Sequence, residues 1–166
     1  MSPTTTALLL WLFVIFLGTA FGAGVYEHRV VLPRWVETSG DSGGHWNADA
    51  ARRDDSGRRF WAFVTTVPLT LLTLANLWAA WQAPAPLRTW WLIAAGVALV
   101  ERAFTFGYFI PTMVGLMNAA DSPASVAAAA RWSTFNYLRH VLTLTAWLAA
   151  LRTFGLFHQH RPPFGN

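Results

Sequence analysis

An asparagine, an arginine and a histidine lie inside an apolar stretch near the carboxyl end of this 166-residue chain. Asn136, Arg139 and His140 stand at positions i, i+3 and i+4 of the run from 131 to 154, so a helix would place them on one face. Ionisable side chains at membrane depth are costly in hydrocarbon, and they therefore face a bundle interior or a wet cavity. The triplet marks a candidate functional site within a membrane bundle.

These side chains have the types that acid–base chemistry requires. His140 could act as a general base, while Arg139 and Asn136 could donate hydrogen bonds to an oxyanion that develops on a substrate. Glu101, in the preceding apolar run, is the fourth catalytic candidate. Alternatively, Glu101 could neutralise Arg139 or its neighbour Arg102 and so hold the bundle together. The sequence leaves both interpretations of Glu101 open.

The apolar run that contains Glu101 carries a polar stripe. Glu101, Thr105, Tyr108 and Thr112 recur at i, i+4, i+7 and i+11, which places them on one face of a continuous helix. Arg102 points about 100° away from that face in an α-helix, so it should not share it. The stripe predicts one wall of a polar pocket, with Thr105 and Tyr108 as substrate-binding candidates.

The histidines also raise a metal alternative. His28 and His140, with Glu27 or Glu101, have the types of a histidine–carboxylate metal site, but no HxxxH or ExxH spacing places two ligands on one helix. We therefore predict no metal and no cofactor. A metal or a bis-histidine haem held by His28 and His140 remains the alternative.

Four long apolar runs must position these groups. The chain is 54% hydrophobic and 12% charged, which is outside the norm for soluble domains. We predict an all-α polytopic membrane protein, a four-transmembrane-helix antiparallel bundle that forms one domain over residues 1–166. Its spans are predicted at about 7–32, 60–82, 90–117 and 132–154. The first run is predicted to be a retained span and not a signal peptide, because no basic residue precedes it and three more runs follow.

The segments outside the runs are polar. Residues 33–59 are rich in Gly, Ser, Asp and Arg, which predicts a long solvated loop. The alternative is a lid in which His45 and Trp46 cap a pocket. The segment 155–166 is predicted to be a mobile tail, because it begins with Gly155 and contains a Pro-Pro pair.

An antiparallel arrangement would gather the polar groups in one half of the bundle. The end of the first span, the start of the second, the end of the third and the start of the fourth would meet at the side of the 33–59 loop. Substrate-binding candidates in that half are Glu27, His28, Thr66, Thr105 and Tyr108. The other half is almost purely apolar. The sequence thus predicts a half-membrane polar pocket.

Arginine placement predicts the orientation of this pocket. The arginines on the pocket side outnumber those on the opposite side by six to three: Arg34, Arg52, Arg53, Arg58, Arg59 and Arg131 against Arg88, Arg152 and Arg161. Basic residues in short loops favour the cytoplasmic side. We therefore predict a multi-pass protein of the cell membrane with its pocket face in the cytoplasm and both termini outside.

The composition also limits the function classes and partners. With no cysteine, the chain forms no disulfide and has no thiolate ligand or nucleophile. Its arginines form no basic stripe with interleaved aromatic residues, so we predict no nucleic-acid binding. Ten tryptophans, many of them near the ends of the apolar runs, are typical of aromatic belts at membrane interfaces. The predicted partners are the lipid bilayer and a lipophilic small molecule, and a homo-oligomer or a larger membrane complex is left open.

Three stretches carry a resemblance to a known family. The stretches GAGVYEHRVVLPRW, FTFGYFIPTMVGLMN and RWSTFNYLRHVLTLTAW resemble the DUF1772 family, a group of four-helix integral membrane proteins that includes the anthrone oxygenases. The positions that carry the resemblance are Pro33, Thr105, Pro111, Trp132, Asn136 and Arg139. The resemblance implies an oxygenase that needs neither metal nor flavin, in which a base removes an acidic C–H proton and the carbanion reacts with dioxygen.

These observations lead to one functional hypothesis and its alternatives. We expect a membrane-embedded oxidoreductase that resembles the cofactor-independent anthrone oxygenases and acts on an apolar aromatic or quinone-like substrate in the polar pocket. The alternatives are a non-enzymatic accessory subunit of a membrane complex, a protein that binds a lipophilic ligand, and a haem- or metal-binding four-helix bundle.

Overall fold

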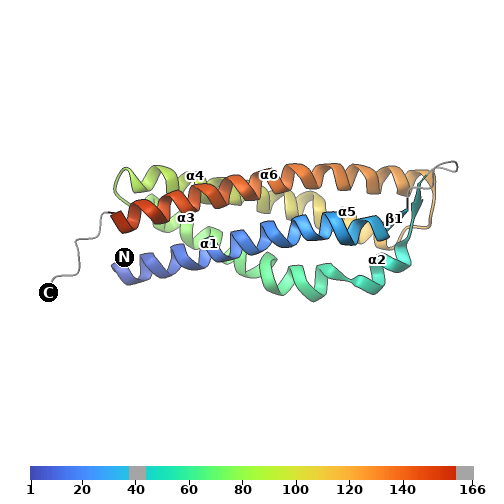
Figure 1. The fold of residues 1–166 in the computed structure, drawn as a ribbon, viewed down its shortest axis with the longest axis horizontal. Helices are drawn as coiled ribbons and strands as arrows, with labels where there is room; N and C mark the ends of the chain where they lie inside the picture. The colour runs from blue at the N-terminus through green and yellow to red at the C-terminus, as the bar shows by residue number, and fades with distance from the viewer. Residues whose placement is uncertain (38–43, 160–166) are drawn as a thin grey trace.

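The fold is helical and contains four long apolar helical segments, each of which is called a body below. The computed structural model describes residues 1–37 and 44–159, and over these residues the chain is helical apart from one very short hairpin (Figure 1). Four bodies are long and apolar enough to cross a membrane: Pro3–Arg34, Gly57–Trp81, Leu87–Met117 and Pro123–Gln159. The predicted all-α fold with four membrane-length helices is confirmed.

Three of the four bodies are composite. The first joins α1 (Pro3–Tyr26), the π-helical η1 (Glu27–Val31) and the 3₁₀ turn η2 (Leu32–Arg34). The second joins the π-helical η3 (Gly57–Thr66) to α3 (Val67–Trp81), and the third joins α4 (Leu87–Phe104), the π-helical η4 (Thr105–Phe109) and α5 (Ile110–Met117). The fourth body is the single helix α6 (Pro123–Gln159). Between the first two bodies lie β1 (Val36–Glu37), β2 (His45–Trp46) and α2 (Ala48–Asp54).

The helices pack as a closed ring. Each of α1, α3, α4 and α6 contacts two of the others, in the order α1, α3, α4, α6 and back to α1. Contacts are most extensive between α4 and α6, whose facing positions carry alanines that let two backbones approach closely: Ala94, Ala95, Ala98, Ala146, Ala149 and Ala150. The amino terminus lies at the same end as the close of α6, and β1 and α2 lie at the other end (Figure 1).

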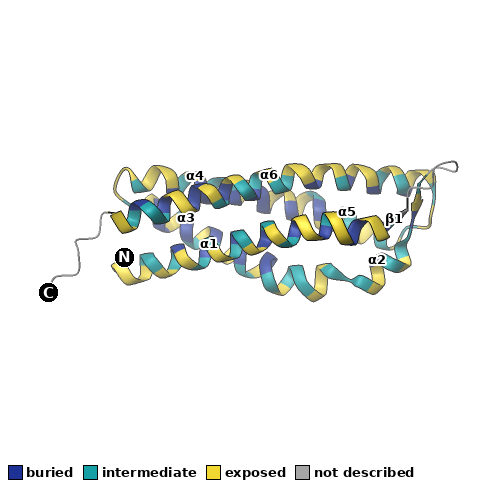
Figure 2. Cartoon of the chain, viewed as in Figure 1, coloured by how far each residue is buried: buried dark blue, intermediate teal, exposed yellow. Residues whose placement is uncertain are grey.

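The outer surface of the ring is apolar over a membrane thickness. Exposed and buried residues alternate along the long helices (Figure 2). On α6, Arg131 and Arg152 are both exposed and lie 21 positions apart, which corresponds to about 32 Å of helix. This matches the roughly 30 Å hydrocarbon core of a bilayer. The large exposed side chains between them are Phe135, Tyr137, Leu138, Val141, Leu148 and Leu151.

Each π-helical segment is followed by a proline. The segments end at Val31, Thr66 and Phe109, and in each case a proline stands two residues later, at positions 33, 68 and 111. A proline has no backbone N–H and its ring crowds the carbonyl four residues earlier, so the regular α-helical ladder cannot continue. The helix widens to i→i+5 bonds before each proline, and such segments are frequent at functional sites.

The last helix is longer than the predicted span of about 132–154. The helix α6 starts at Pro123, where the Ser122 hydroxyl accepts from the Ser125 backbone N–H, and it continues through Gly155 to Gln159. The predicted mobile tail from 155 is therefore wrong for 155–159. Leu156 is buried at the end of the ring, and this packing outweighs the low helix propensity of glycine. The rest of the predicted tail, 160–166, lies outside the described residues.

The described part of the 33–59 segment is packed against the bundle and is not a solvated loop. Trp35 and Trp46 are buried, and their indole N–H groups donate to Asp54 Oδ2 at 2.8 Å and to the Leu116 carbonyl at 2.9 Å. Asp121 fixes the hairpin, because its carboxylate accepts from the Trp46 backbone N–H at 2.8 Å and contacts His45 Nδ1 at 2.5 Å. Two buried indoles therefore outweigh the polar composition from which a loop was predicted.

The contact between Asp121 and the hairpin should make this end of the protein acid-sensitive. The backbone hydrogen bond from Trp46 and the contact with His45 hold the pKa of Asp121 below its usual range. A lowered folded-state pKa stabilises the hairpin above the ordinary aspartate value of about 4, and this contribution is lost as the pH falls through the lowered value. We expect the hydrogen-exchange protection of the Trp46 amide to drop below about pH 4.

The control variants separate this effect from general acid unfolding. Asp121→Asn should weaken the protection at neutral pH and remove the acid step. Asp49→Asn removes another carboxylate of the same region, one whose partner is Arg52, and should leave the step in place. An unchanged acid step in Asp121→Asn would show that Asp121 is not the group that titrates.

Candidate functional site

The largest concentration of polar side chains surrounds a cavity in the half of the bundle near β1. The cavity has a volume of about 540 Å³, within the usual range of small-molecule sites. All four bodies and the α2 region contribute to its wall. Its polar and charged lining residues are Glu27, Arg52, Asp55, Ser56, Arg58, Thr66, Glu101, Arg102, Thr105, Asn118, Arg139, His140 and Thr143.

One side of the cavity is an ion pair between the first and last bodies. Glu27 is 7% exposed, and its Oε1 accepts hydrogen bonds from Ser56 Oγ at 2.6 Å and from the Trp61 indole at 2.8 Å. Its Oε2 lies 3.9 Å from Arg139 Nη2. The sequence offered Arg139 or Arg102 as the partner of Glu101. The structure pairs Glu101 with Arg102, and it pairs Arg139 with Glu27, because the first body and α6 are neighbours in the ring.

Aromatic rings complete the environment of Arg139. Its guanidinium lies 5.1 Å from the centroid of the Trp61 ring and 5.0 Å from that of Phe109. Contacts of this kind stabilise a desolvated cation through the quadrupole of the ring. Arg139 is thus held by a carboxylate and two rings from three different bodies, which fixes the relative positions of η1, η3 and η4 around α6.

A second ion pair lies deeper in the bundle. Glu101 and Arg102 are 2% and 6% exposed, and Arg102 donates to Glu101 Oε2 through both Nε, at 2.5 Å, and Nη2. Thr105 Oγ1 donates to the other oxygen of Glu101 at 2.9 Å. Arg102 was expected to point away from Glu101. Its long side chain instead bends back to the carboxylate, because a buried cation at that depth needs an anion beside it to compensate its charge.

His140 lines the cavity and packs against the backbone of α1 at a glycine. The ring packs on Gly24 of α1, where an added Cβ would lie 2.8 Å from His140 Cε1 and 3.1 Å from Nδ1. The buried Nε2 of His140 has no hydrogen-bond partner among the described residues. Gly18 of the same helix makes a similar contact, because an added Cβ would lie 3.0 Å from the Trp147 ring, whereas one at Gly22 would meet nothing within 4 Å.

His28 contacts His140 but does not line the cavity. Its ring centroid lies 5.8 Å from that of His140 and 4.3 Å from that of Tyr137, and its Nδ1 is buried without a partner in the described chain. These two imidazoles are the residues that the metal or haem alternative requires. Within residues 1–37 and 44–159, no group of three or more His, Asp or Glu side chains is placed to hold a metal ion.

The π-helical segment η4 shifts the polar stripe of the third body. The cavity is lined at spacings of four residues by Glu101, Thr105, Phe109 and Met113, and not by Tyr108. A π-helical turn takes more residues than an α-helical turn, so the face drifts by one position. The placement of Tyr108 in the pocket is therefore wrong, and its ring packs on Phe109 and Phe135 instead.

Asn136 is also outside the wall. It is buried, its Nδ2 donates to the Trp132 carbonyl of the same helix at 3.1 Å, and its Oδ1 has no partner among the described residues. Of the predicted site residues, six line the cavity and three do not. Those that line it are Glu27, Thr66, Glu101, Thr105, Arg139 and His140, and those that do not are His28, Tyr108 and Asn136.

Sequence reasoning did not assign Arg102, Ser56, Trp61, Phe109 or Trp132 to the site. The indoles of Trp61 and Trp132 were counted as members of an interface belt, yet their N–H groups point inward, to Glu27 and to the Phe109 carbonyl. The prolines at 68 and 111 were the available signal. They mark the π-helical segments that bring these aromatic residues to the cavity.

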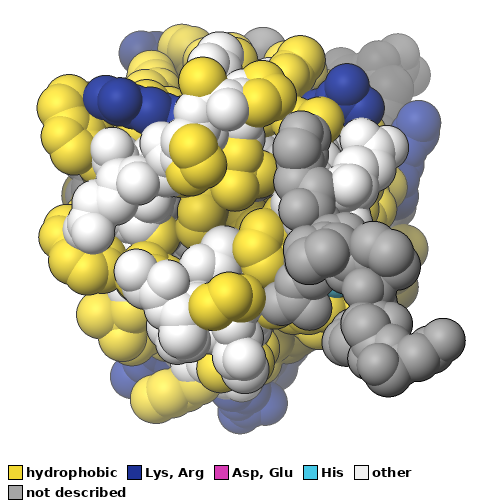
Figure 3. Space-filling model, turned by 90° about the vertical axis from the view of Figure 1, so that its left-hand side faces the viewer, with side chains coloured by type: hydrophobic (Ala, Val, Ile, Leu, Met, Phe, Trp, Pro, Cys, Tyr) yellow, Lys and Arg dark blue, Asp and Glu magenta, His cyan; other side chains and the backbone are white. Residues whose placement is uncertain are grey.

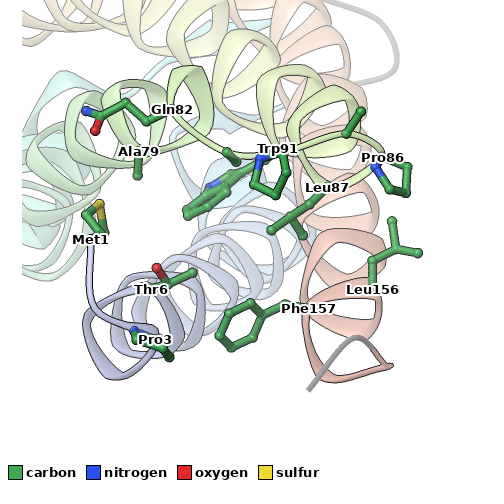
Figure 4. Close-up of a pocket in the computed structure, with 13 residues that line it drawn as sticks. Met1, Pro3, Thr6, Ala79, Gln82, Pro86, Leu87, Trp91, Leu156 and Phe157 are labelled. Atoms are coloured by element: carbon green, nitrogen blue, oxygen red, sulfur yellow. The ribbon is translucent and has the colours of Figure 1, made fainter. Parts of the chain in front are cut away.

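A second cavity lies at the opposite end of the bundle and lacks comparable chemistry. It has a volume of about 410 Å³ and lies between the start of α1, the α3–α4 connection and the end of α6 (Figure 4). Thr6 and Gln82 are the polar side chains among the residues that line it, and none of those residues is Asp, Glu, His, Lys or Arg. The face at this end shows hydrophobic and arginine side chains but no acidic ones among the described residues (Figure 3).

The contact between Gly24 and His140 can be tested by adding a methyl group. Gly24→Ala must displace the His140 ring or part α1 from α6, and overpacking of this kind costs about 1–3 kcal/mol. We expect a lower midpoint of thermal unfolding for the detergent-solubilised protein. Gly22→Ala is the matched control, since its new methyl group meets nothing within 4 Å. Equal losses in the two variants would contradict the contact.

Comparison with known proteins adds no assignment to this site. The chain matches no protein-family model, no curated protein and no solved structure. The resemblance to the DUF1772 family therefore stays a prediction. Any functional proposal must be built on the geometry of the cavity and on the chemistry of its walls.

Proposed function

We propose that the protein is a membrane-embedded oxygenase that needs no cofactor, similar to the anthrone oxygenases, with His140 as its general base. The observation that carries the proposal is the unpartnered His140 Nε2 at the wall of a cavity with aromatic and apolar surfaces. A base must reach the proton that it removes, and it must be free of competing protein partners. Among the predicted catalytic residues that line the cavity, His140 has a ring nitrogen without a partner among the described residues, which supports the second condition.

The proposed reaction oxidises a methylene group that is made acidic by flanking aryl rings and a carbonyl. His140 takes one C–H proton, the resulting carbanion passes one electron to dioxygen, and the two radicals join in a C–O bond. The proton on His140 converts the peroxide to a hydroperoxide, which loses water and leaves a carbonyl. In total, one methylene and one dioxygen give one carbonyl and one water.

The substrate class follows from the walls of the cavity. Trp35, Trp61, Phe109 and Trp132 supply aromatic surface, and Met113 and Met117 supply adaptable apolar surface. A flat, mostly apolar aromatic molecule with a few polar oxygens fits these walls better than a sugar, a nucleotide or a peptide.

Loss of the imidazole should abolish this activity. With anthrone as the probe substrate, His140→Ala should lower dioxygen uptake by the purified protein by a factor of at least about 10², the lower end of a typical general-base contribution. The thermal midpoint should stay close to that of the parent protein. His158→Ala is the control, because His158 is exposed on the last turns of α6 at the opposite end. Full activity in His140→Ala would remove His140 from the mechanism.

A protein that binds a lipophile without converting it is the second candidate. The observation in its favour is that the carboxylates of Glu27 and Glu101 already have protein partners, through hydrogen bonds and ion pairs. Groups satisfied in this way brace a bundle and need not take part in proton transfer. This candidate predicts that the protein retains aromatic ligands but shows no dioxygen uptake with or without His140.

We also propose that the four bodies form an antiparallel bundle in the cell membrane, with the cavity toward the cytoplasm. Acidic residues contribute little to orientation, so the arginine count decides it. Exposed arginines near the cavity are Arg29, Arg34, Arg52, Arg53, Arg58, Arg59 and Arg131, and those at the opposite end are Arg88 and Arg152. Arg161 lies outside the described residues.

A fusion experiment tests the orientation. A reporter that is active only outside the cytoplasm, fused after residue 166, should be active, because the close of α6 lies at the end away from the cavity. The same reporter inserted between residues 38 and 43 should be silent. The reverse pattern would place the cavity on the external side.

A further inference from the structure

The unpaired polar atoms of the cavity define what a ligand must supply. Five buried side-chain atoms have no hydrogen-bond partner among the described residues, and only two of them belong to residues of the cavity wall: Arg102 Nη1 and His140 Nε2. The imidazole nitrogen is a donor or an acceptor, depending on its tautomer. A guanidinium nitrogen can only donate. The partner that Arg102 lacks is therefore a hydrogen-bond acceptor.

The orientation of the Arg102 guanidinium is fixed before a ligand arrives. Nε and Nη2 both donate to Glu101 Oε2, and Thr105 occupies the other carboxylate oxygen. The remaining nitrogen, Nη1, is buried with the rest of this 6%-exposed residue. A buried donor without an acceptor is costly, so an acceptor that reaches Nη1 gains more than it would at a solvated arginine.

Charge balance shows which kind of acceptor fits. Within the membrane half that holds the cavity, Arg102 is matched by Glu101 and Arg139 by Glu27. A carboxylate or phosphate ligand would leave one negative charge uncompensated in a site of low dielectric. A carbonyl oxygen accepts the same hydrogen bond and leaves the balance unchanged. The geometry therefore favours an uncharged acceptor over an anion.

The apolar part of the ligand has a route from the bilayer. Along the second and third bodies α3 packs on α4, but η3 and α5 make few contacts with each other. The cavity lies between them, and its wall includes Ile110 and Val114, which are 41% and 54% exposed on the outer face of the bundle. Because this part of the cavity wall faces the outer side of the bundle, it is the side from which a molecule dissolved in the membrane would reach the cavity.

We infer that Arg102 anchors the ligand: its Nη1 donates to an uncharged carbonyl oxygen of a flat lipophile that enters from the bilayer between η3 and α5. This inference rests on the proposed function for the identity of the site. It adds the ligand class and a donor that the sequence had not assigned. In the proposed reaction the same nitrogen would stabilise the enolate oxygen that forms when His140 removes the proton.

The test compares three tricyclic probes that share a body and differ in polar groups. Anthraquinone carries carbonyl oxygens, anthracene carries none, and anthracene-9-carboxylate carries a negative charge. Binding to the full chain in lipid nanodiscs is measured by quenching of tryptophan fluorescence, with empty nanodiscs as the partition reference. We expect anthraquinone to bind on the order of ten-fold more tightly than either other probe, as for a hydrogen bond to a charged donor.

Arg102→Lys is the decisive variant. The substitution keeps a positive charge beside Glu101 but removes the guanidinium group. The charges at positions 101 and 102 therefore still balance, while Nη1 is lost. The preference for anthraquinone over anthracene should disappear, and anthracene affinity should not change. The control is Arg88→Lys, an exposed arginine at the opposite end that lies over Trp81. A second variant, Glu101→Gln with Arg102→Met, removes both charges together and should show the same loss of preference.

Each contrary result overturns the inference. Equal binding of anthraquinone and anthracene by the parent protein would show that no side chain donates a hydrogen bond to the carbonyl oxygen. Tightest binding of the carboxylate would show an anion site, and a preference that survives in Arg102→Lys would place the donor elsewhere. The readout needs no turnover, so selective binding without dioxygen uptake would reject the proposed chemistry and leave this inference standing. Dioxygen uptake that depends on His140, found together with equal binding of anthraquinone and anthracene, would support the proposed function and reject the inference about Arg102.

Discussion

The rest of the structure depends on the need to neutralise two arginines inside an apolar bundle. Arg102 and Arg139 are both largely removed from solvent, and an uncompensated charge at that depth would cost several kcal/mol. Arg102 is compensated within its own helix by Glu101. Arg139 is compensated from another body by Glu27, so the position of α1 relative to α6 follows from electrostatics as well as from packing.

The prolines at 33, 68 and 111 explain why there is room for these pairs. Each interrupts the α-helical ladder just after the level of the site, and the π-helical turns that precede them widen three of the four bodies there. In the opposite half of the ring, the described helices have no such interruption and close over alanines and leucines. One sequence feature, repeated in three helices, thus marks the half of the bundle that holds the polar cavity.

Sequence reasoning predicted the number and type of helices and brought Glu27, Arg139 and His140 to one depth of the bundle. Long apolar runs and costly intramembrane charges are strong signals. It failed at Tyr108, where one π-helical turn moved the wall by a residue, and at Gly155, where the packing of Leu156 outweighed helix propensity. Such errors depend on contacts between distant segments, which periodicity within a single helix does not contain.

The absence of proline from α6 after its first residue has a consequence for motion. Three walls of the cavity belong to bodies that can bend at a proline, whereas Arg139 and His140 lie on one continuous helix of 37 residues. Bending of the other bodies would change the width of the cavity without changing the distance between these two side chains. The helix α6 therefore keeps the proposed base and the cation beside it at a constant spacing, while the wall that carries Arg102 can move relative to them.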